Sequence, residues 1–154
     1  MANPITVDGI EGVKSLIGQE LGPTDWVEIT QEMVNQFADA TGDHQWIHVD
    51  TGKAAAGPFG TTIAHGFLSL SLFPALTPEI YLIEGVKMGI NYGTNKVRFP
   101  SPLPVGSKVR AGATLMSVEQ TKDGGYQVTN EVTLEREGGE KPICVAQTVA
   151  RLYF

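Results

Sequence analysis

The pattern of hydrophobic and polar positions divides the chain into a helical first part and a strand-rich second part. Residues 9–18 and 31–40 place apolar side chains at helical spacing and predict two short helices, with an edge strand at 25–29 between them. From about Gly85 onward, Val, Thr, Ile and Tyr dominate four segments that we expect to be strands: 86–99, 108–120, 126–136 and 142–154. The sequences KDGG and EGGEK between the last three are typical of hairpin turns, so the pattern predicts an antiparallel meander.

The segment 63–76, IAHGFLSLSLFPAL, is apolar on nearly every side and contains a single histidine as its only titratable residue. Such a segment predicts a helix that is buried on most sides. Pro74 is expected to bend the end of this helix, and Pro78 to lie in its exit. Helices followed by an antiparallel sheet predict an α+β fold in which a curved sheet wraps the buried helix.

Composition narrows the class of protein. A chain of 154 residues with 42% apolar and 18% charged residues predicts one globular domain over residues 1–154. No run of 18 apolar residues is present and the N-terminus does not resemble a secretory signal, so we expect no membrane span. The net charge of −6 argues against nucleic acid and anionic membranes as partners. Cys144 is the only cysteine, which excludes an internal disulfide and favours the cytoplasm.

Asp43 is expected just past the end of a helix, because Thr30 is a typical N-cap and Gly42 a typical helix-ending residue. His48 follows five positions later across a turn, so both side chains can converge on one water molecule. Hydration of a conjugated double bond needs a base for the water and an acid for the α-carbon, and a carboxylate and an imidazole can divide this work. The spacing alone leaves equally open that Asp43 caps the next turn and that His48 is an ordinary, partly buried histidine.

A metal site is the second interpretation of this region, because all three histidines, His44, His48 and His65, fall within 22 residues. His44 and His48 are four positions apart and would share a helix face, with Asp43, Asp50 or His65 as a third ligand. The segment, however, has no HExxH motif and follows a helix stop. We therefore predict no metal ion here and expect His44 at the surface.

Gly66 lies where the apolar helix opens, and main-chain N–H groups at that end have no helical partner and carry the positive end of the dipole. Such a group can polarise a thioester carbonyl, and a glycine lets a substrate approach closely. Equally, Gly66 can serve only to pack the helix against the sheet. For His65 beside it, a structural role is favoured over a ligand contact or a cap.

Other parts of the sequence restrict the function further. No GxGxxG, Walker or GxSxG motif is present, and no cofactor is predicted. Residues 91–93 and 96–99 can line a pocket or bind a phosphate, although such a run is more often a strand with one polar face. Cys144 lies in the strand-like stretch PICVAQTV and is expected to be a small core residue rather than a nucleophile.

Taken together, these motifs resemble a known family. Asp43-x-x-x-x-His48, preceded by Phe37-Ala-Asp-Ala-Thr-Gly and followed by Ala64-His65-Gly66-Phe67, resembles the signature of MaoC-like (R)-specific enoyl-CoA hydratases. The strings DHQWIHVD, GPFGTTIAHGFLSLSL and NYGTNKVRFPSP are similar to the nodulation-protein-N-like branch of that group. The resemblance extends from about Leu21 to the end of the chain.

The resemblance implies a hot-dog fold, an α+β arrangement in which an antiparallel sheet wraps a long central helix, and a homodimer formed through sheet edges. It implies that Asp43 and His48 are catalytic and that the Gly66 N–H binds the thioester carbonyl. The implied reaction converts trans-2-enoyl-CoA, or an acyl-carrier-protein thioester, to the (R)-3-hydroxyacyl product. The residues expected to contact the substrate are Ile63, Ala64, His65, Gly66, Asn91, Tyr92 and Arg98.

Two departures from the family pattern leave the substrate open. Gln45-Trp46 replaces a common Asn-Pro, and Pro74 stands where a polar residue is frequent. We expect the acyl chain to run along the central helix, past Phe67, Leu68, Leu72 and Phe73. Thioester hydrolysis and non-catalytic binding of an acyl thioester remain alternative functions, since hot-dog folds support more than one activity.

Overall fold

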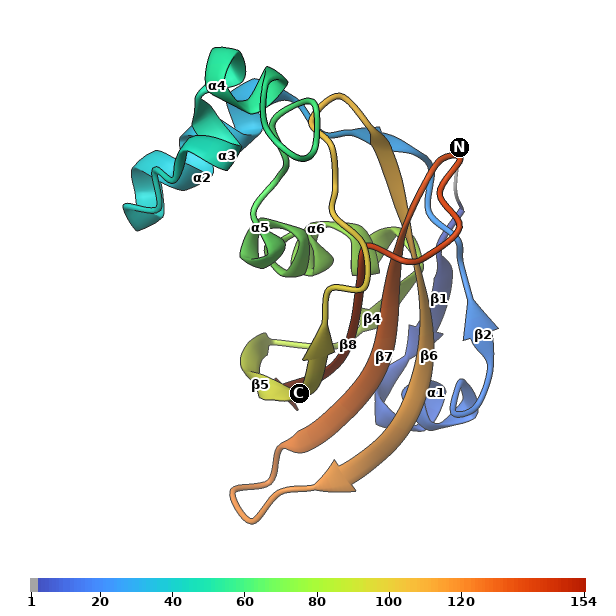
Figure 1. Ribbon diagram of the computed structural model, residues 1–154. Coiled ribbons are helices and arrows are strands. Elements are labelled where there is room, and N and C mark those ends of the chain that lie inside the picture. The colour runs from blue at the N-terminus through green and yellow to red at the C-terminus, as the bar shows by residue number, and fades with distance from the viewer. Residues whose placement is uncertain (1–2) are drawn as a thin grey trace.

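A curved six-stranded sheet is the frame of the computed structural model, which describes residues 3–154 (Figure 1). Its strands follow the order β2-β6-β7-β8-β5, and β3 also pairs with β6. The long strands are β5 (Met88–Arg98), β6 (Lys108–Gln120), β7 (Tyr126–Arg136) and β8 (Cys144–Tyr153), and the short ones are β2 (Glu20–Leu21) and β3 (Val27–Glu28).

The pairing of these strands confirms two of the predicted hairpins and corrects the rest of the predicted meander. β6, β7 and β8 are antiparallel neighbours, joined by the two expected turns. β5, however, pairs with β8 at the far edge and not with β6, the next strand in the chain. The connection carries the chain back along the segment before the central helix, where Leu103 accepts a main-chain hydrogen bond from Ala64. β5 is left with one unpaired edge among the described strands.

The central helical segment lies against the concave face of the sheet, as the α+β hot-dog arrangement requires (Figure 1). It comprises α5 (Gly66–Ser71) and α6 (Phe73–Leu76), followed by the 3₁₀ turn η1 (Thr77–Glu79). The long helix expected from residue 63 therefore starts later and is interrupted at Leu72. Pro74 explains the interruption, because it has no N–H to donate to the carbonyl of Leu70. No helix of residues 3–154 is long and apolar enough to cross a membrane.

The remaining elements lie at the two ends of the sheet. At one end, β1 (Ile5–Asp8) and β4 (Tyr81–Glu84) form a parallel pair beside α1 (Gly9–Ser15). At the other, α2 (Gln31–Thr41), α3 (Trp46–Val49) and α4 (Thr51–Ala55) cluster above the start of α5 (Figure 1). The sequence pattern predicted α1, α2 and the strand that contains β3. It did not predict the β1–β4 pair or the helices α3 and α4.

The hydrophobic core fills the space between the sheet and the central helix. Buried aliphatic side chains of β6 and β7, including Leu115 and Leu134, face Leu68, Phe73 and Leu76 of α5 and α6. Complete burial of one such side chain contributes about 1.5–3 kcal/mol to the free energy of folding. The apolar side chains of the helical segment thus join it to the sheet in one core.

Cys144 belongs to this core, as predicted, and this gives a direct test of the packing. Its side chain is 0% exposed, and burial raises the pKa of the thiol to about 11. At pH 8 only about one thiol in a thousand is then ionised, and the thiolate is the reactive form. We expect a thiol-specific chromogenic reagent to leave the native protein unlabelled and to label the chain unfolded in guanidinium chloride. Rapid labelling of the native protein would contradict this packing.

Candidate active site

Helix α2 places Asp43 at the edge of the site. Thr30 caps the helix by accepting a hydrogen bond from Met33 N at 3.2 Å, as predicted. Gly42 ends it with a φ of 84°, a left-handed conformation that favours glycine, and donates to Ala38 O. Asp43 follows in an irregular loop with an exposed side chain. Its Oδ1 is 3.4 Å from the Gln45 main-chain nitrogen, which donates to it.

His48 is the buried partner of Asp43, with only 6% of its surface exposed. It lies in α3, and its Nδ1 is 2.7 Å from the main-chain oxygen of Ile63. A carbonyl oxygen can only accept, so Nδ1 carries the proton and donates it in this bond. The other nitrogen, Nε2, then keeps a free lone pair in the neutral ring. His48 is therefore held as an acceptor, which is the state that a general base requires.

His65 connects the two candidate catalytic residues. Its Nε2 is 3.0 Å from the main-chain oxygen of Asp43 and donates to it. Its ring stacks on that of His48, with centroids 3.9 Å apart and an interplanar angle of 26°, and the Phe37 ring lies 4.8 Å away. The expected structural role of His65 is consistent with these contacts. His65 fixes the Asp43 loop through its main chain and makes no hydrogen bond to the Asp43 carboxylate.

Together, Asp43, His48 and His65 form a compact cluster. One nitrogen or carboxylate oxygen from each lies within 4.8 Å of the others, a separation that a single water molecule can bridge. The same distances raise the question of a metal ion. Two imidazoles and one carboxylate are also a donor set that binds metal ions, and His65 Nδ1 is buried without a hydrogen-bond partner among the described residues. The expectation that no metal binds here therefore stays a prediction.

The metal interpretation required His44 and His48 to share one helix face, and they do not. Helix α3 begins at Trp46, and His44 lies outside it, exposed, 3.9 Å from a carboxylate oxygen of Asp39. The premise of a metal site with both residues on one helix face is therefore wrong. His44 is at the surface, as expected.

Gly66 begins α5 directly beside this cluster. Among the hydrogen bonds of the described residues, none uses its N–H. A Cβ at this position would lie 3.1–3.2 Å from three atoms of the Phe99 ring, which is tighter than ordinary contact. Both interpretations of this glycine thus have support, because its N–H is available and its lack of a side chain lets Phe99 pack against it.

The structure brings some of the expected substrate-contacting residues together and separates others. Ile63 and Ala64 form the buried strand-like segment that leads into His65 and Gly66. Asn91, Tyr92 and Arg98 lie on β5, and among the described residues none of them forms a hydrogen bond or ion pair with Asp43 or His48. Tyr92 stacks with the guanidinium of Arg151 at 3.7 Å, and Arg98 Nη1 donates to Val97 O.

Comparison with known proteins identifies the family. The sequence model of the family described as "MaoC like domain" matches residues 13–136 of this chain. The chain belongs to the MaoC-like domain family. It is 56% identical to 3-hydroxyacyl-thioester dehydratase Z of Mycobacterium tuberculosis, over 95% of this chain and 97% of that protein. It is 43% identical to Nodulation protein N of Rhizobium meliloti, over 94% of this chain and 91% of that protein.

A solved structure supports the same assignment for the fold. The (R)-hydratase from A. caviae involved in PHA biosynthesis is 25% identical, with a TM-score of 0.69, over 89% of this chain and 96% of that chain. This confirms the resemblance on which the hot-dog expectation rested. The MaoC-like chain described here therefore has the hot-dog fold, with the central helical segment divided at Leu72.

Gln31 of this MaoC-like protein is a positioning residue that sequence reasoning missed. Its amide nitrogen donates to His48 O at 2.8 Å, and its amide oxygen accepts from the Thr62 hydroxyl at 2.7 Å. One side chain of α2 thereby ties α3 to the segment before α5. No periodicity marks Gln31, since it is the first polar residue of an amphipathic helix and its partners lie 17 and 31 positions away.

The family departure at Gln45 and Trp46 has a local explanation. Gln45 stands as the residue before α3, and its carbonyl accepts from His48 N at 3.0 Å. Trp46 packs on Gly57, where an added Cβ would lie 3.0 Å from the indole, and the Lys53 ammonium is 4.7 Å from the ring centroid. The indole of α3 thus contacts both Lys53 of α4 and Gly57 in the loop that follows α4.

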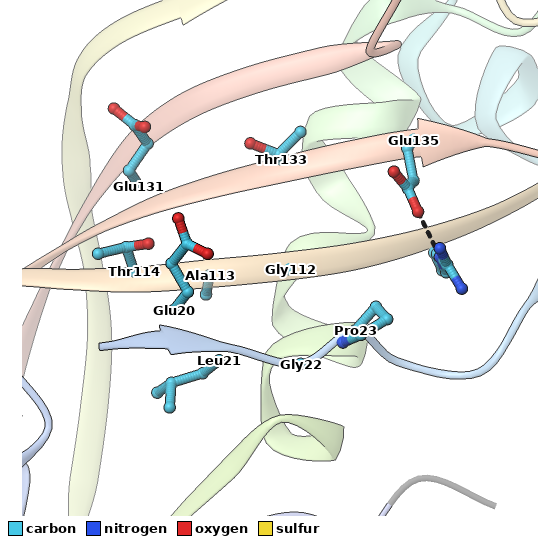
Figure 2. A pocket seen from close by; sticks show the side chains of 11 residues that line it. Glu20, Leu21, Gly22, Pro23, Gly112, Ala113, Thr114, Glu131, Thr133 and Glu135 are labelled. Carbon is cyan, nitrogen blue, oxygen red and sulfur yellow. Dashed lines mark hydrogen bonds and ion pairs between the residues drawn. The ribbon is translucent and has the colours of Figure 1, made fainter. Parts of the chain in front are cut away.

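Of the hollows among the described residues, two bear on the function, and neither is lined by Asp43, His48 or His65. One of about 460 Å³ is on the outer face of β2, β6 and β7, where Figure 2 shows the carboxylates of Glu20, Glu131 and Glu135. Arg110 pairs with Glu135, which leaves a net negative charge that is unsuited to the phosphates of CoA. The other, of about 520 Å³, lies between α5–α6 and strands β4, β5 and β8 and is lined mainly by apolar residues.

Substitution of Gln31 tests whether it supports the site. Gln31→Leu leaves the buried Thr62 hydroxyl and the His48 carbonyl without their partner, so the free energy of unfolding should fall by about 1–3 kcal/mol. Gln36→Leu, at an exposed glutamine of the same helix, is the matched control and should change it by less than about 0.5 kcal/mol. Urea unfolding of both variants measures the difference, and equal stabilities would remove Gln31 from this role.

Proposed function

We propose that this protein catalyses the reversible hydration of trans-2-enoyl thioesters to (R)-3-hydroxyacyl thioesters, with acyl-CoA or acyl-carrier-protein substrates. The observation that carries the proposal is the buried His48, held with its Nε2 lone pair free, within water-bridging distance of Asp43. The name of the M. tuberculosis relative, 3-hydroxyacyl-thioester dehydratase Z, describes the same reaction in reverse. The A. caviae structure is named as an (R)-hydratase.

In the proposed mechanism, Asp43 and His48 hold one water molecule between them. His48 Nε2 removes a proton from this water while the oxygen forms a bond to the β-carbon. The electron pair of the C=C bond moves toward the thioester carbonyl and gives an enolate. The proton is then returned from the Asp43–His48 pair to the α-carbon on the same face. Addition is therefore syn, and no redox step or cofactor enters the balance.

Gly66 supplies the remaining requirement of this mechanism, which is a donor for the enolate oxygen. Its N–H has no partner among the described residues and lies beside His65 at the start of α5. A fixed main-chain donor directed at developing negative charge contributes more in the transition state than in the ground state. Gly66 is therefore proposed to bind the thioester carbonyl, while Ile63, Ala64 and His65 form the wall behind it.

An assay with trans-2-enoyl-CoAs of four to about sixteen carbons tests the proposal. Loss of the enoyl absorbance and formation of the (R)-3-hydroxyacyl product, identified by chiral chromatography, are expected. Release of free thiol without hydration would instead show a thioesterase. Tight acyl-CoA binding without either reaction, unchanged by Asp43→Asn, would show a non-catalytic binding protein.

Substitution of the catalytic pair gives a sharper test. Asp43→Asn and His48→Gln should each lower kcat by at least about 100-fold, the usual scale for acid–base catalysis. The double variant should lose little more than the worse single one, because both residues act on one water. Asp39→Asn and His44→Gln make the same chemical changes at exposed positions and are the controls. A variant of Asp43 or His48 with parental kcat would exclude that residue from the mechanism.

We also propose that the protein is a homodimer formed through β5. One edge of this strand is unpaired, and large apolar side chains are exposed along it and beside it: Phe67, Met88, Ile90, Tyr92 and Phe99. Pairing of two such edges across a two-fold axis removes unpaired main-chain groups and covers these side chains.

Light scattering at micromolar concentration measures this prediction. The parent should have twice the mass of one chain, and Ile90→Lys should lower it toward that of a single chain, because a buried unpaired ammonium is costly. Lys87→Glu, at an exposed polar position before the strand, is the control. A monomeric parent would refute the proposal.

A further inference from the structure

A row of polar side chains crosses the mainly apolar cavity of about 520 Å³ beside α5 and α6. Thr94 of β5 lies opposite Thr148 of β8, and Thr148 lies opposite Asn130 of β7. All three line the cavity, and they face Leu70 and Phe73 of the central helical segment across it. Thr94, Thr148 and Asn130 together form a polar row across the sheet.

Tyr81 of β4 extends the polar row into the core. Its hydroxyl donates to Asn130 Oδ1 at 3.2 Å and accepts from Asn130 Nδ2 at 2.9 Å. Both side chains are buried, with 7% and 6% exposed, and desolvation raises the pKa of Tyr81, so its hydroxyl keeps its proton. These two bonds use only one of the two amide hydrogens of Asn130.

The rest of the polar row also has unused hydrogen-bonding capacity. Among the described residues, no side-chain hydrogen bond is made by the hydroxyl of Thr94 or of Thr148. An unsubstituted alkyl chain in this cavity would displace the water from these two hydroxyls and from the second amide hydrogen of Asn130. It would offer no hydrogen bond in place of those made to water. A hydroxyl or carbonyl group on the chain would instead bond to them. Sites built to bond a substrate hydroxyl discriminate strongly against the analogue that lacks it.

The cavity is positioned to receive the acyl part of a substrate bound at Gly66. Leu70 follows Gly66 by four residues within α5, so both lie on the same face of that helix, and Leu70 lines the cavity. Leu70 is then about 6 Å along the helix axis from Gly66. Of the four residues expected along the chain's path, only Phe73 lines this cavity, and Phe67 is 68% exposed.

We infer that the protein selects enoyl thioesters whose acyl chain carries a hydroxyl or carbonyl group away from the reacting double bond. Tyr81 and the polar row, through Asn130 above all, recognise this group. The inference rests on the proposed hydration, because it places the thioester carbonyl at Gly66. It assigns Asn130 and Tyr81 a role in specificity and none in proton transfer.

The test compares matched substrates of six, eight, ten and twelve carbons, each with a terminal methyl or a terminal hydroxyl. At the best length, the parent should show at least about a tenfold higher kcat/KM for the hydroxylated chain. The double variant Tyr81→Phe/Asn130→Leu should lose this preference and keep its kcat/KM for four-carbon crotonyl-CoA. Replacing both partners together avoids leaving either one buried and unpaired. Thr129→Val is the control, since Thr129 neighbours Asn130 on β7 but does not line the cavity.

Calorimetric binding of the saturated octanoyl-CoA and 8-hydroxyoctanoyl-CoA separates this inference from the proposed reaction. A preference for the hydroxylated ligand that the double variant abolishes supports the inference, even if no hydration occurs. Hydration of crotonyl-CoA together with equal binding and equal kcat/KM for all matched pairs overturns the inference and leaves the proposed function intact. A preference that persists in the double variant also overturns it, because other groups would then be responsible.

Discussion

The main-chain oxygen of Ile63 determines which nitrogen of His48 carries a proton, and the site depends on this bond. The oxygen is available only because the chain is extended at Ile63, between Ile47 on one side and the Pro104 bridge on the other. In a helix that began at Ile63, the same oxygen would accept from the residue four positions later and would not reach the imidazole. The late start of α5 is therefore a requirement of the site.

Much of the architecture was readable from local patterns, because local interactions determine it. β6 and β7 have the predicted bounds, and Thr30 and Gly42 begin and end α2 as their side-chain chemistry implies. The position of β5 in the sheet could not be predicted from the sequence. Its pattern of apolar and polar residues does not decide whether it pairs with β6 or with β8, because pairing preferences depend on the neighbouring strands. The β1–β4 pair is too short to leave a periodic signal.

The candidate site was likewise predictable only in part from the sequence. Asp43, His48 and Gly66 were candidates because the motif that contains them resembles a known family, whereas their spacing alone left structural roles equally open. The contacts of His65 and Gln31 were not predicted, because both side chains donate to main-chain oxygens. Every residue has such an oxygen, so the sequence does not indicate which one a side chain will bond. Main-chain geometry in this site thus decides which side chains are free to react, and the side chains that arrange it are recognisable only once the fold is known.

The bond from His65 to the main chain of Asp43, rather than to its carboxylate, has a practical consequence. This anchor of the loop uses an atom that every amino acid possesses, so the bond from His65 does not depend on the side chain at position 43. Under the proposed mechanism, binding and turnover are therefore separable by chemistry at this one position. A protein with a non-reacting side chain there would serve as an affinity reagent that retains acyl thioesters from a metabolite mixture, and mass spectrometry of what it retains would identify the natural substrate.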